Sequence, residues 1–496
     1  MTDPSPRKAR VRGTHSTTDV KPERIKRYSQ HPHPSERALG RALNPDNGHG
    51  AGDGFGGSDF PDREEPTRPD VPHPSEPPKR FAEAMQRGLA AHAQAQRETW
   101  PTVHVIGLHH TVPSEAFSHC AFTGKVLRFP LVLHEAGYRV VEYANGASQS
   151  EADEKVSIWS VDQLSKLAGG DDALFSKTTS GLDSDPELRE LFGILVQREL
   201  RKRLKPGDIV AHVFGCTESA QRLVKAFPQA IHVETGIGYG SGPFGCYRIF
   251  ESESWRAWHM GRYTLANNGG GGTWPNYPEL TTTQVVPNYY DPETFPLGDG
   301  GGCIDGAAIK HKPYVLWVGR LSSIKGPEVV NLLAQANPGI TFKCVSGDPL
   351  TDDFRKDRLN AANVEFLGRV SARVDLAKLY GGASAVVMPS LFWEPFGGVA
   401  VEALMCGTPV LCPDYAAFVE TVAHAEDGVR CNTPEDYLLG LELLLSQERD
   451  LGKSGRAKRR ARAIERFGVK HVGLRYKAAL GAIRRWHAQG LRPEGA

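Results

Sequence analysis

The sequence predicts an α/β protein with two Rossmann-like domains that follow a long polar segment. The chain has 496 residues, which is longer than a single hydrophobic core usually supports. Short apolar runs alternate with stretches of helical spacing in both halves, which is the pattern of βαβ units and parallel sheets. Aliphatic residues are nearly absent before residue 79, so that part of the chain cannot form a core.

The composition narrows the class of protein. The formal charge is +1 and 40% of the residues are hydrophobic, which argues against a general affinity for polyanions. No run of about 18 apolar residues predicts a membrane-spanning helix, and the basic N-terminus lacks the apolar core of a secretory signal. The eight cysteines are scattered without a closely spaced pair, so we expect a soluble protein in a reducing cytoplasm and no metal site.

Residues 1–78 are rich in Pro, Gly, Ser and basic side chains. Such a segment buries too little apolar surface to offset its chain entropy, so we expect a disordered basic tail. The tail could tether a nucleic acid or another partner, but a charged tail that is simply solvated is the favoured interpretation. The same choice arises for the basic stretch Lys453–Arg462, where a solvated helix face is favoured over nucleic-acid contact.

The first strand–helix–strand unit begins with the apolar strand Thr102–Leu108, after an amphipathic helix over Pro78–Arg97. Parallel sheets bind ligands beyond the carboxyl ends of their strands. The loop after this strand therefore brings His109, His110 and His119 near a crevice. One of them could be a base or a ligand clamp, and polar loop residues without a ligand are the equally open alternative.

A later strand of the same half, Ala230–Glu234, leads into a glycine-rich loop. The loop approaches the dinucleotide-binding pattern G-x-G-x-x-G, but Ser241 stands at the last position and no helix follows. Glu234 and Tyr239 fit a wall of the ligand cleft or, equally, a structural turn. A helix is expected over Phe250–Met260.

Asp183 and Asp185 form an Asp-x-Asp pair of the kind that can bind a metal. Asp185 directly precedes Pro186 and an amphipathic helix, and this is the position of a residue that caps a helix start. Capping is therefore favoured over a metal site.

The most informative stretch is Ser384–Leu411, in which a buried strand and a loop lead to the sequence PFGG at residues 395–398. A helix is expected to begin at Gly398. The free N–H groups and the dipole of such a helix start favour an anion such as a phosphate. Glu394 and Glu402 flank this point and would repel a phosphate, so we expect them to accept hydrogen bonds from sugar and ribose hydroxyls.

This Glu-x7-Glu frame resembles the nucleotide-sugar signature of retaining glycosyltransferases with the two-domain GT-B fold, the family 4-like or group 1 glycosyl transferases. Other segments match this family in the same order: Gly319-Arg320, Lys325-Gly326, Phe366–Val370 and Leu376–Tyr380. The match is good over Lys312–Arg430 and weaker over Pro101–Pro296.

The resemblance implies a domain organisation. An acceptor-binding domain is expected over residues 79–297 and a glycine-rich hinge over 298–311. A nucleotide-sugar domain is expected over 312–467, and a last helix within 468–496 should cross back onto the first domain. A central cleft should separate the two domains.

The resemblance also implies roles for individual residues. Arg320 and Lys325 would bind the diphosphate of the donor, Glu402 the ribose hydroxyls, and Glu394 the donor sugar near its anomeric carbon. The remaining donor contacts are those to the base and to the sugar and phosphates, and they would come from Arg369, Val370, Phe396, Gly397 and Gly398. Tyr289 stands where the family usually has glycine.

The expected function is transfer of a sugar from a nucleoside-diphosphate sugar to an unidentified acceptor. The resemblance implies retention at the anomeric carbon, and two cations beside a helix start can stabilise the leaving diphosphate without a metal or another cofactor. Retention through a covalent intermediate on Glu394 and departure and attack on one face both stay open. The alternatives are an epimerase or a phosphorylase of the same fold, or a non-catalytic protein that binds a sugar nucleotide or a nucleic acid.

Overall fold

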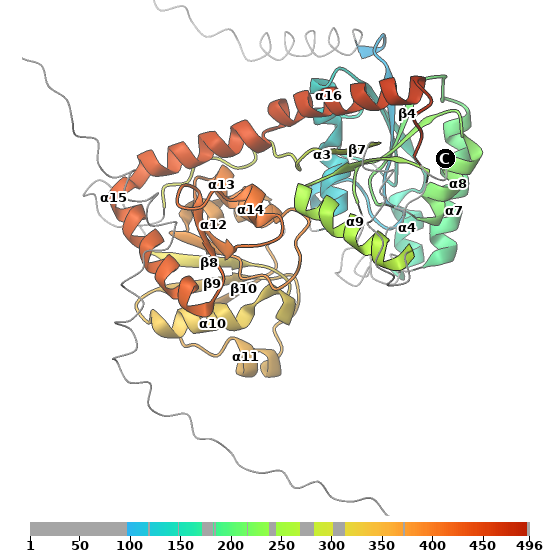
Figure 1. The fold of residues 1–496 in the computed structure, drawn as a ribbon. Coiled ribbons are helices and arrows are strands. Elements are labelled where there is room, and N and C mark those ends of the chain that lie inside the picture. The colour runs from blue at the N-terminus through green and yellow to red at the C-terminus, as the bar shows by residue number, and fades with distance from the viewer. Residues whose placement is uncertain are drawn as a thin grey trace, which may run out of the picture. The chain divides into compact units, whose positions relative to one another are not determined.

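A computed structural model describes residues 97–117, 120–146, 148–170, 182, 185–215, 217–237, 245–267, 282–300, 313–370 and 373–493 (Figure 1). The expected tail over residues 1–78, nearly all of the expected helix Pro78–Arg97, and residues 301–311 of the expected hinge lie outside these ranges.

The first half of the described chain forms a parallel sheet of seven strands in the order β3-β2-β1-β4-β5-β6-β7. The strands are β1 (Thr102–Ile106), β2 (Arg139–Ala144), β3 (Glu154–Ser157), β4 (Ile209–His212), β5 (Ile231–Glu234), β6 (Tyr247–Phe250) and β7 (Thr283–Val285). Both neighbours of β1 lie in parallel register, with His104 opposite Val141 of β2 and Val210 of β4. This confirms the predicted βαβ organisation.

The connections between these strands carry the turn η2 (Glu115–Phe117) and the helices α3 (Ala121–Glu135), α4 (Val161–Ala168), α7 (Pro186–Arg201), α8 (Glu218–Ala226) and α9 (Glu253–Asn267). The capping role of Asp185 is confirmed, because its Oδ1 accepts hydrogen bonds from the N–H groups of Glu187 and Leu188 at 2.9 and 3.1 Å. Asp183 lies outside the described residues. The helix expected from Phe250 begins only at Glu253, since Phe250 ends β6 and Ser252 Oγ accepts from Trp255 N at 3.0 Å.

The second half of the described chain forms a parallel sheet of six strands in the order β10-β9-β8-β11-β12-β13. Its strands are β8 (Tyr314–Val318), β9 (Thr341–Val345), β10 (Val364–Gly368), β11 (Ala385–Val387), β12 (Val410–Pro413) and β13 (Gly428–Cys431). Its connections carry the turn η4 (Ser323–Lys325) and the helices α10 (Pro327–Ala336), α11 (Asp352–Arg358), α12 (Arg373–Gly382), α13 (Gly398–Met405) and α14 (Phe418–Thr421). The predicted start of α13 at Gly398 is confirmed.

Two long helices end the chain, α15 (Pro434–Phe467) and α16 (Val469–Ala488). Gly452 interrupts α15 with φ 49° and ψ −137°, a backbone conformation that glycine adopts at little cost. Apolar side chains of α16, among them Val472, Tyr476 and Ile483, are buried in the core of the first sheet, and α16 runs beside α3 (Figure 1).

The interpretation of the basic stretch Lys453–Arg462 as a solvated helix face is wrong for its buried members. The Arg456 side chain is 0% exposed and donates to Glu448, the Gly381 carbonyl and the Thr408 hydroxyl. Arg459 is buried too, and it pairs with the same Glu448. These arginines face inward because α15 lies over main-chain carbonyl groups that need donors.

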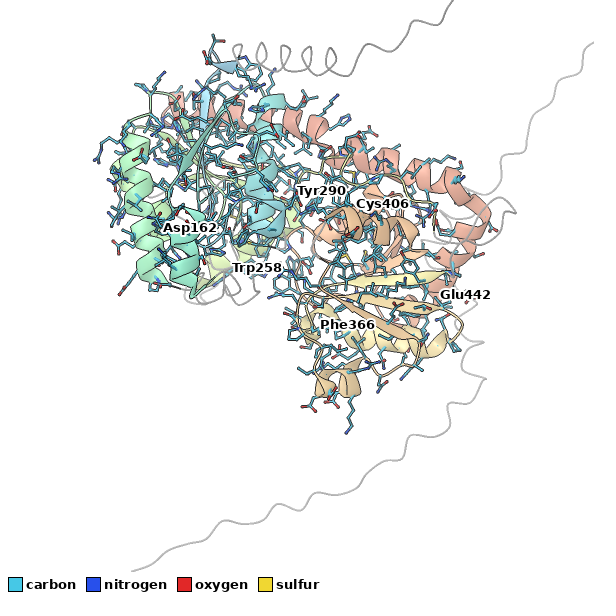
Figure 2. The ribbon with its side chains drawn as sticks, turned by 180° about the vertical axis from the view of Figure 1, so that it is seen from behind. Asp162, Trp258, Tyr290, Phe366, Cys406 and Glu442 are labelled. Atoms are coloured by element: carbon cyan, nitrogen blue, oxygen red, sulfur yellow. The ribbon has the colours of Figure 1, made fainter. Side chains whose placement is uncertain are left out.

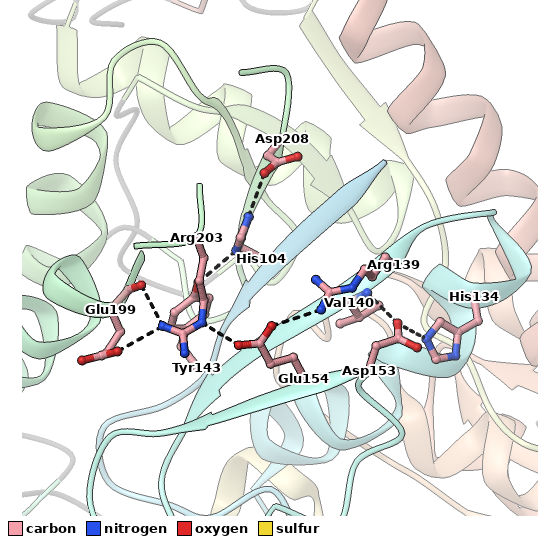
Figure 3. A network of polar contacts seen from close by, with 10 residues as sticks. All are labelled: His104, His134, Arg139, Val140, Tyr143, Asp153, Glu154, Glu199, Arg203 and Asp208. Atoms are coloured by element: carbon pink, nitrogen blue, oxygen red, sulfur yellow. Dashed lines mark hydrogen bonds and ion pairs between the residues drawn. The ribbon is translucent and has the colours of Figure 1, made fainter. Parts of the chain in front are cut away.

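A polar network ties the strands of the first sheet to neighbouring helices (Figure 3). Asp153 accepts hydrogen bonds from Arg97 Nε at 2.7 Å, His134 Nε2 at 3.0 Å and Val140 N at 2.8 Å. Burial alone would raise the pKa of Asp153, but these hydrogen bonds outweigh it and hold the pKa well below its usual range. The network therefore stabilises the first sheet, and none of its members belongs to the predicted site.

Candidate functional site

The candidate site lies where the loops after β8 and β11 meet. These two strands are hydrogen-bonded neighbours, while the chain between them passes through β9 and β10 on the other side of β8. The order of strands therefore reverses between β8 and β11. Open parallel sheets bind their ligands at such a reversal, beyond the carboxyl ends of the strands.

Gly326 holds the loop after β8 against the loop after β11. Its φ is +65°, and an added Cβ atom would lie 2.0 Å from the carbonyl oxygen of Pro389. The Leu391 N–H donates to the Ile324 carbonyl at 2.8 Å across the same contact. Only glycine permits this approach, and it fixes Lys325 beside the β11 loop.

Lys325 and Glu394 form an ion pair in this corner, between Nζ and Oε1. Ser390 Oγ donates to the same carboxylate oxygen at 2.9 Å, and Tyr415 in turn donates to the Ser390 carbonyl. The side chain of Glu394 is 10% exposed and that of Lys325 is 21% exposed. Glu394 is therefore held in one orientation by two donors.

The start of α13 lies directly after this pair. Gly397 has φ +74°, and a Cβ atom there would lie 2.8 Å from the Phe418 ring. No side chain caps the helix. A Cβ atom at Gly398 would lie 2.7 Å from the hydroxyl of Tyr290 (labelled in Figure 2), whose ring stacks on Phe396. An uncapped helix start with two glycines leaves main-chain N–H groups for an anionic ligand.

Glu402 lies one turn into α13 and has two partners. Its Oε1 accepts from Arg373 Nη1 at 3.1 Å, and its Oε2 accepts from the Tyr380 hydroxyl at 2.9 Å. Burial alone would lower the pKa of Arg373, but the charges of Glu402 and Glu115 outweigh it and raise the pKa. Each oxygen of Glu402 keeps a lone pair with which it can accept a hydroxyl hydrogen bond.

Arg128 of α3 also lies at this site, beside Tyr290. The sequence analysis did not identify Arg128 as a site residue. Its guanidinium lies over the Tyr290 ring, with Cζ 5.8 Å from the ring centroid. Its Nε and Nη1 are buried without a hydrogen-bond partner among the described residues. Burial and then the charge of Arg373 lower the pKa of Arg128. The one hint in the sequence was that Arg128 lies in the first helix after the loop that follows β1.

The two halves of the chain also touch through main-chain groups near the site. Ser252 Oγ donates to the carbonyl of Pro395, the neighbour of Glu394, at 2.7 Å. The first N–H groups of α9, those of Glu253 and Ser254, donate to the carboxylate of Glu420 at 2.8 and 2.7 Å. Residue Glu420 of α14 therefore serves as the anion at the start of α9.

The other residues predicted to bind the donor are exposed or border a separate cavity. Arg320 is exposed directly after β8. Arg369 is exposed after β10. Val370 borders a cavity of about 900 Å³ whose walls include Gly298, Tyr314 and Lys343 but none of Lys325, Glu394 and Glu402. Residues 301–312, which follow Gly298 closely in the chain, lie outside the described ranges, so no ligand is assigned to this cavity.

The predicted acceptor-side residues lie inside the first domain. His109 and His110 are buried against the ring of Phe214, and His109 Nε2 lies 3.0 Å from the Leu182 carbonyl oxygen. Glu234 is completely buried and its carboxylate lies 3.2 Å from Arg248 Nε, which indicates a structural ion pair. His119 and Tyr239 lie outside the described residues.

Tyr289, which replaces the usual glycine, points into the first core. Its ring stacks on Phe129 with centroids 5.7 Å apart, and its hydroxyl donates to the Lys125 carbonyl at 2.9 Å. Tyr289 thus joins two elements of the first domain and is not directed at α13. The neighbouring Tyr290 takes the position next to the helix start.

The similarity in sequence to known proteins lies in the second half of the chain. Residues 305–466 match the model of the glycosyl transferases group 1. The chain is 33% identical over 173 residues to the D-inositol 3-phosphate glycosyltransferase of Segniliparus rotundus, which covers 32% of this chain and 36% of that protein. It is 34% identical over 157 residues to the glycogen synthase of Mycobacterium tuberculosis, covering 30% and 36%. The matched stretches thus span about a third of these relatives.

Similarity in fold to solved structures extends over a longer part of the chain than similarity in sequence. The sucrose-phosphate synthase of Thermosynechococcus elongatus superposes with a TM-score of 0.53 at 16% identity, covering 79% of this chain and all of that chain. This confirms the predicted GT-B fold of two Rossmann-like domains. None of the helices in the described part of the chain has the length together with the hydropathy that a bilayer span requires.

Proposed function

From the match of residues 305–466 to the model of the glycosyl transferases group 1, we propose that the protein transfers a sugar from a nucleoside-diphosphate sugar to an acceptor held by the first domain. One arrangement carries the proposal: the uncapped start of α13 lies beside a cation, Lys325, and between two carboxylates, Glu394 and Glu402. A phosphate-binding helix start with flanking hydroxyl acceptors fits a sugar nucleotide.

In the proposed reaction the bond between the anomeric carbon and the diphosphate oxygen breaks, and a bond from that carbon to an acceptor oxygen forms. Negative charge then grows on the diphosphate, where Lys325, Arg320 and the α13 N–H groups would stabilise it without a metal. The acceptor proton passes to the departing phosphate if both events occur on one face, which retains the configuration. Retention through a covalent intermediate on Glu394 is the alternative route.

The test is nucleoside-diphosphate release from a panel of uridine, guanosine and adenosine diphosphate sugars. We expect slow release from one donor and a decrease of at least about tenfold in Glu402→Gln, which removes a charged acceptor. Glu442→Gln is the matched control, because Glu442 is exposed on α15 (Figure 2). A chelator should leave the release unchanged. If the unmodified chain neither binds nor hydrolyses any donor, the proposal fails.

A further inference from the structure

Two guanidinium groups from different halves of the chain converge over Gly124 of α3. A Cβ atom added at Gly124 would lie 3.2 Å from Nη2 of Arg128 and 3.3 Å from Nη2 of Arg373. The missing side chain at this position therefore leaves room for both cations. Arg128 belongs to α3 of the first half and Arg373 begins α12 of the second half.

The hydrogen-bond partners at this point are unevenly shared between the two arginines. Arg373 has Glu402 as a close partner and Glu115 as a second one at 3.5 Å, and Glu115 is 52% exposed. Arg128 lies over the Tyr290 ring, and its buried Nε and Nη1 lack any hydrogen-bond partner in the described part of the chain. Burial and the charge of Arg373 lower the pKa of Arg128, and the charge of Glu402 offsets only part of this effect. This arrangement favours occupancy by an anionic group.

Tyr290 contacts both the Arg128 guanidinium and the start of α13. Its ring lies under the Arg128 guanidinium, and its hydroxyl is the nearest atom to the space above Gly398. Arg128 is therefore close to the same uncapped helix start that the proposed function gives to the donor. The planar fork of arginine matches two oxygens of one phosphate group.

We infer that Arg128 binds a phosphate group of the donor's diphosphate together with the start of α13, and that Arg373 lies beside it as the counter-ion of Glu402. This deepens the proposed function and rests on it. The donor would then be held by α3 of the first sheet as well as by the loops after β8 and β11. The hydrogen bonds from Arg373 and Tyr380 would hold the Glu402 carboxylate in one orientation for hydroxyl groups.

Calorimetric titration with UDP, GDP and ADP tests the inference in the full chain. We expect Arg128→Met to weaken binding of the diphosphate that the unmodified chain binds by at least about tenfold. Affinity for the corresponding nucleoside, which lacks the phosphates, should not change. Arg485→Met is the matched control, since Arg485 is exposed on α16. Arg128→Lys keeps the charge without the fork, so we expect several-fold weaker binding.

The melting temperature separates a binding role from a structural one. Removal of the Arg128 cation relieves its burial and its repulsion from Arg373, so Arg128→Met should melt at the same or a higher temperature without ligand. If it binds the diphosphate as tightly as the unmodified chain, the inference is overturned while the proposed function stands. If it does not fold, unchanged affinity in Arg128→Lys overturns the inference equally. If the unmodified chain binds none of the three diphosphates, the proposed function fails and the inference falls with it.

Discussion

Lys325 and Glu394 are 69 residues apart in the sequence and form an ion pair where the loops after β8 and β11 meet. Each of them has a separate role in the proposed reaction, on the diphosphate and on the sugar. Their contact neutralises both charges, so neither is left buried alone. A donor that enters would exchange this ion pair for contacts of Lys325 with phosphate and of Glu394 with hydroxyl groups.

Lys325→Met tests this exchange. The change removes one cation of the proposed diphosphate site and leaves Glu394 without its ion-pair partner. We expect donor turnover to fall about 100-fold, because the charge that develops on the leaving group is no longer stabilised. Steady-state release of nucleoside diphosphate measures kcat and KM, and Lys458→Met, at an exposed position of α15, should change neither. Equal turnover in the two variants would remove Lys325 from the mechanism.

Gly326→Ala tests the close approach that positions Lys325. The new Cβ would collide with the Pro389 carbonyl in addition to the strain of φ +65°. Gly137→Ala is a matched control, because Gly137 has φ +86° with nothing within 4 Å of a Cβ atom. We expect Gly137→Ala to cost about 1–2 kcal/mol in free energy of unfolding, and Gly326→Ala to cost clearly more. Urea unfolding compares them, and similar losses would show that the Pro389 contact relaxes freely.

Arg456→Met tests whether the basic stretch of α15 is structural. Arg456 is completely buried and bonds to Glu448, Gly381 and Thr408, so its removal leaves several polar groups unpaired. We expect a loss of about 3–5 kcal/mol in free energy of unfolding. The exposed Lys458→Met should change the stability by less than about 0.5 kcal/mol. A stable Arg456→Met protein would contradict the inward-facing arrangement.

His259 predicts a loss of stability in mild acid. Burial, followed by the charges of Arg248 and Arg262, lowers the pKa of His259 to about 4, and its ring lies 4.6 Å from that of Trp255. The folded pKa is below the unfolded value of about 6.5, so the stabilisation is complete above pH 6.5 and is lost towards pH 4, at about 1.4 kcal/mol per pH unit.

His259→Phe keeps an aromatic ring in this place and removes the titrating group. We expect similar stability at pH 7.5 and a smaller loss at pH 5.5, measured by urea unfolding followed through tryptophan fluorescence. The buried pair His212 and His232, whose pKa values are also lowered by burial, should preserve part of the pH dependence in the variant. An unchanged pH profile would show that His259 does not contribute.

Much of the fold could be predicted because its signals are local. Buried parallel strands are short apolar runs, and strands such as β1 and β8 stand out for that reason. Strand β6 was missed because its sequence, Tyr247–Phe250, runs without a turn signal towards a helix. The hydrogen bond from Trp255 N to Ser252 Oγ sets the true beginning of that helix, and this contact does not follow from hydrophobic spacing.

The sequence alone was enough to predict a helix that starts at Gly398, with glycines before it and a carboxylate on each side, at Glu394 and Glu402. These features depend only on residues that are close together in the chain. Only the tertiary structure decided what these groups face. Lys325 meets Glu394 because β8 and β11 pair in the second sheet. Arg128 and Arg373 approach each other at Gly124 only when both halves of the chain have folded. A charged side chain carries no local sign of its partner, so its role depends on what the folded chain brings to it.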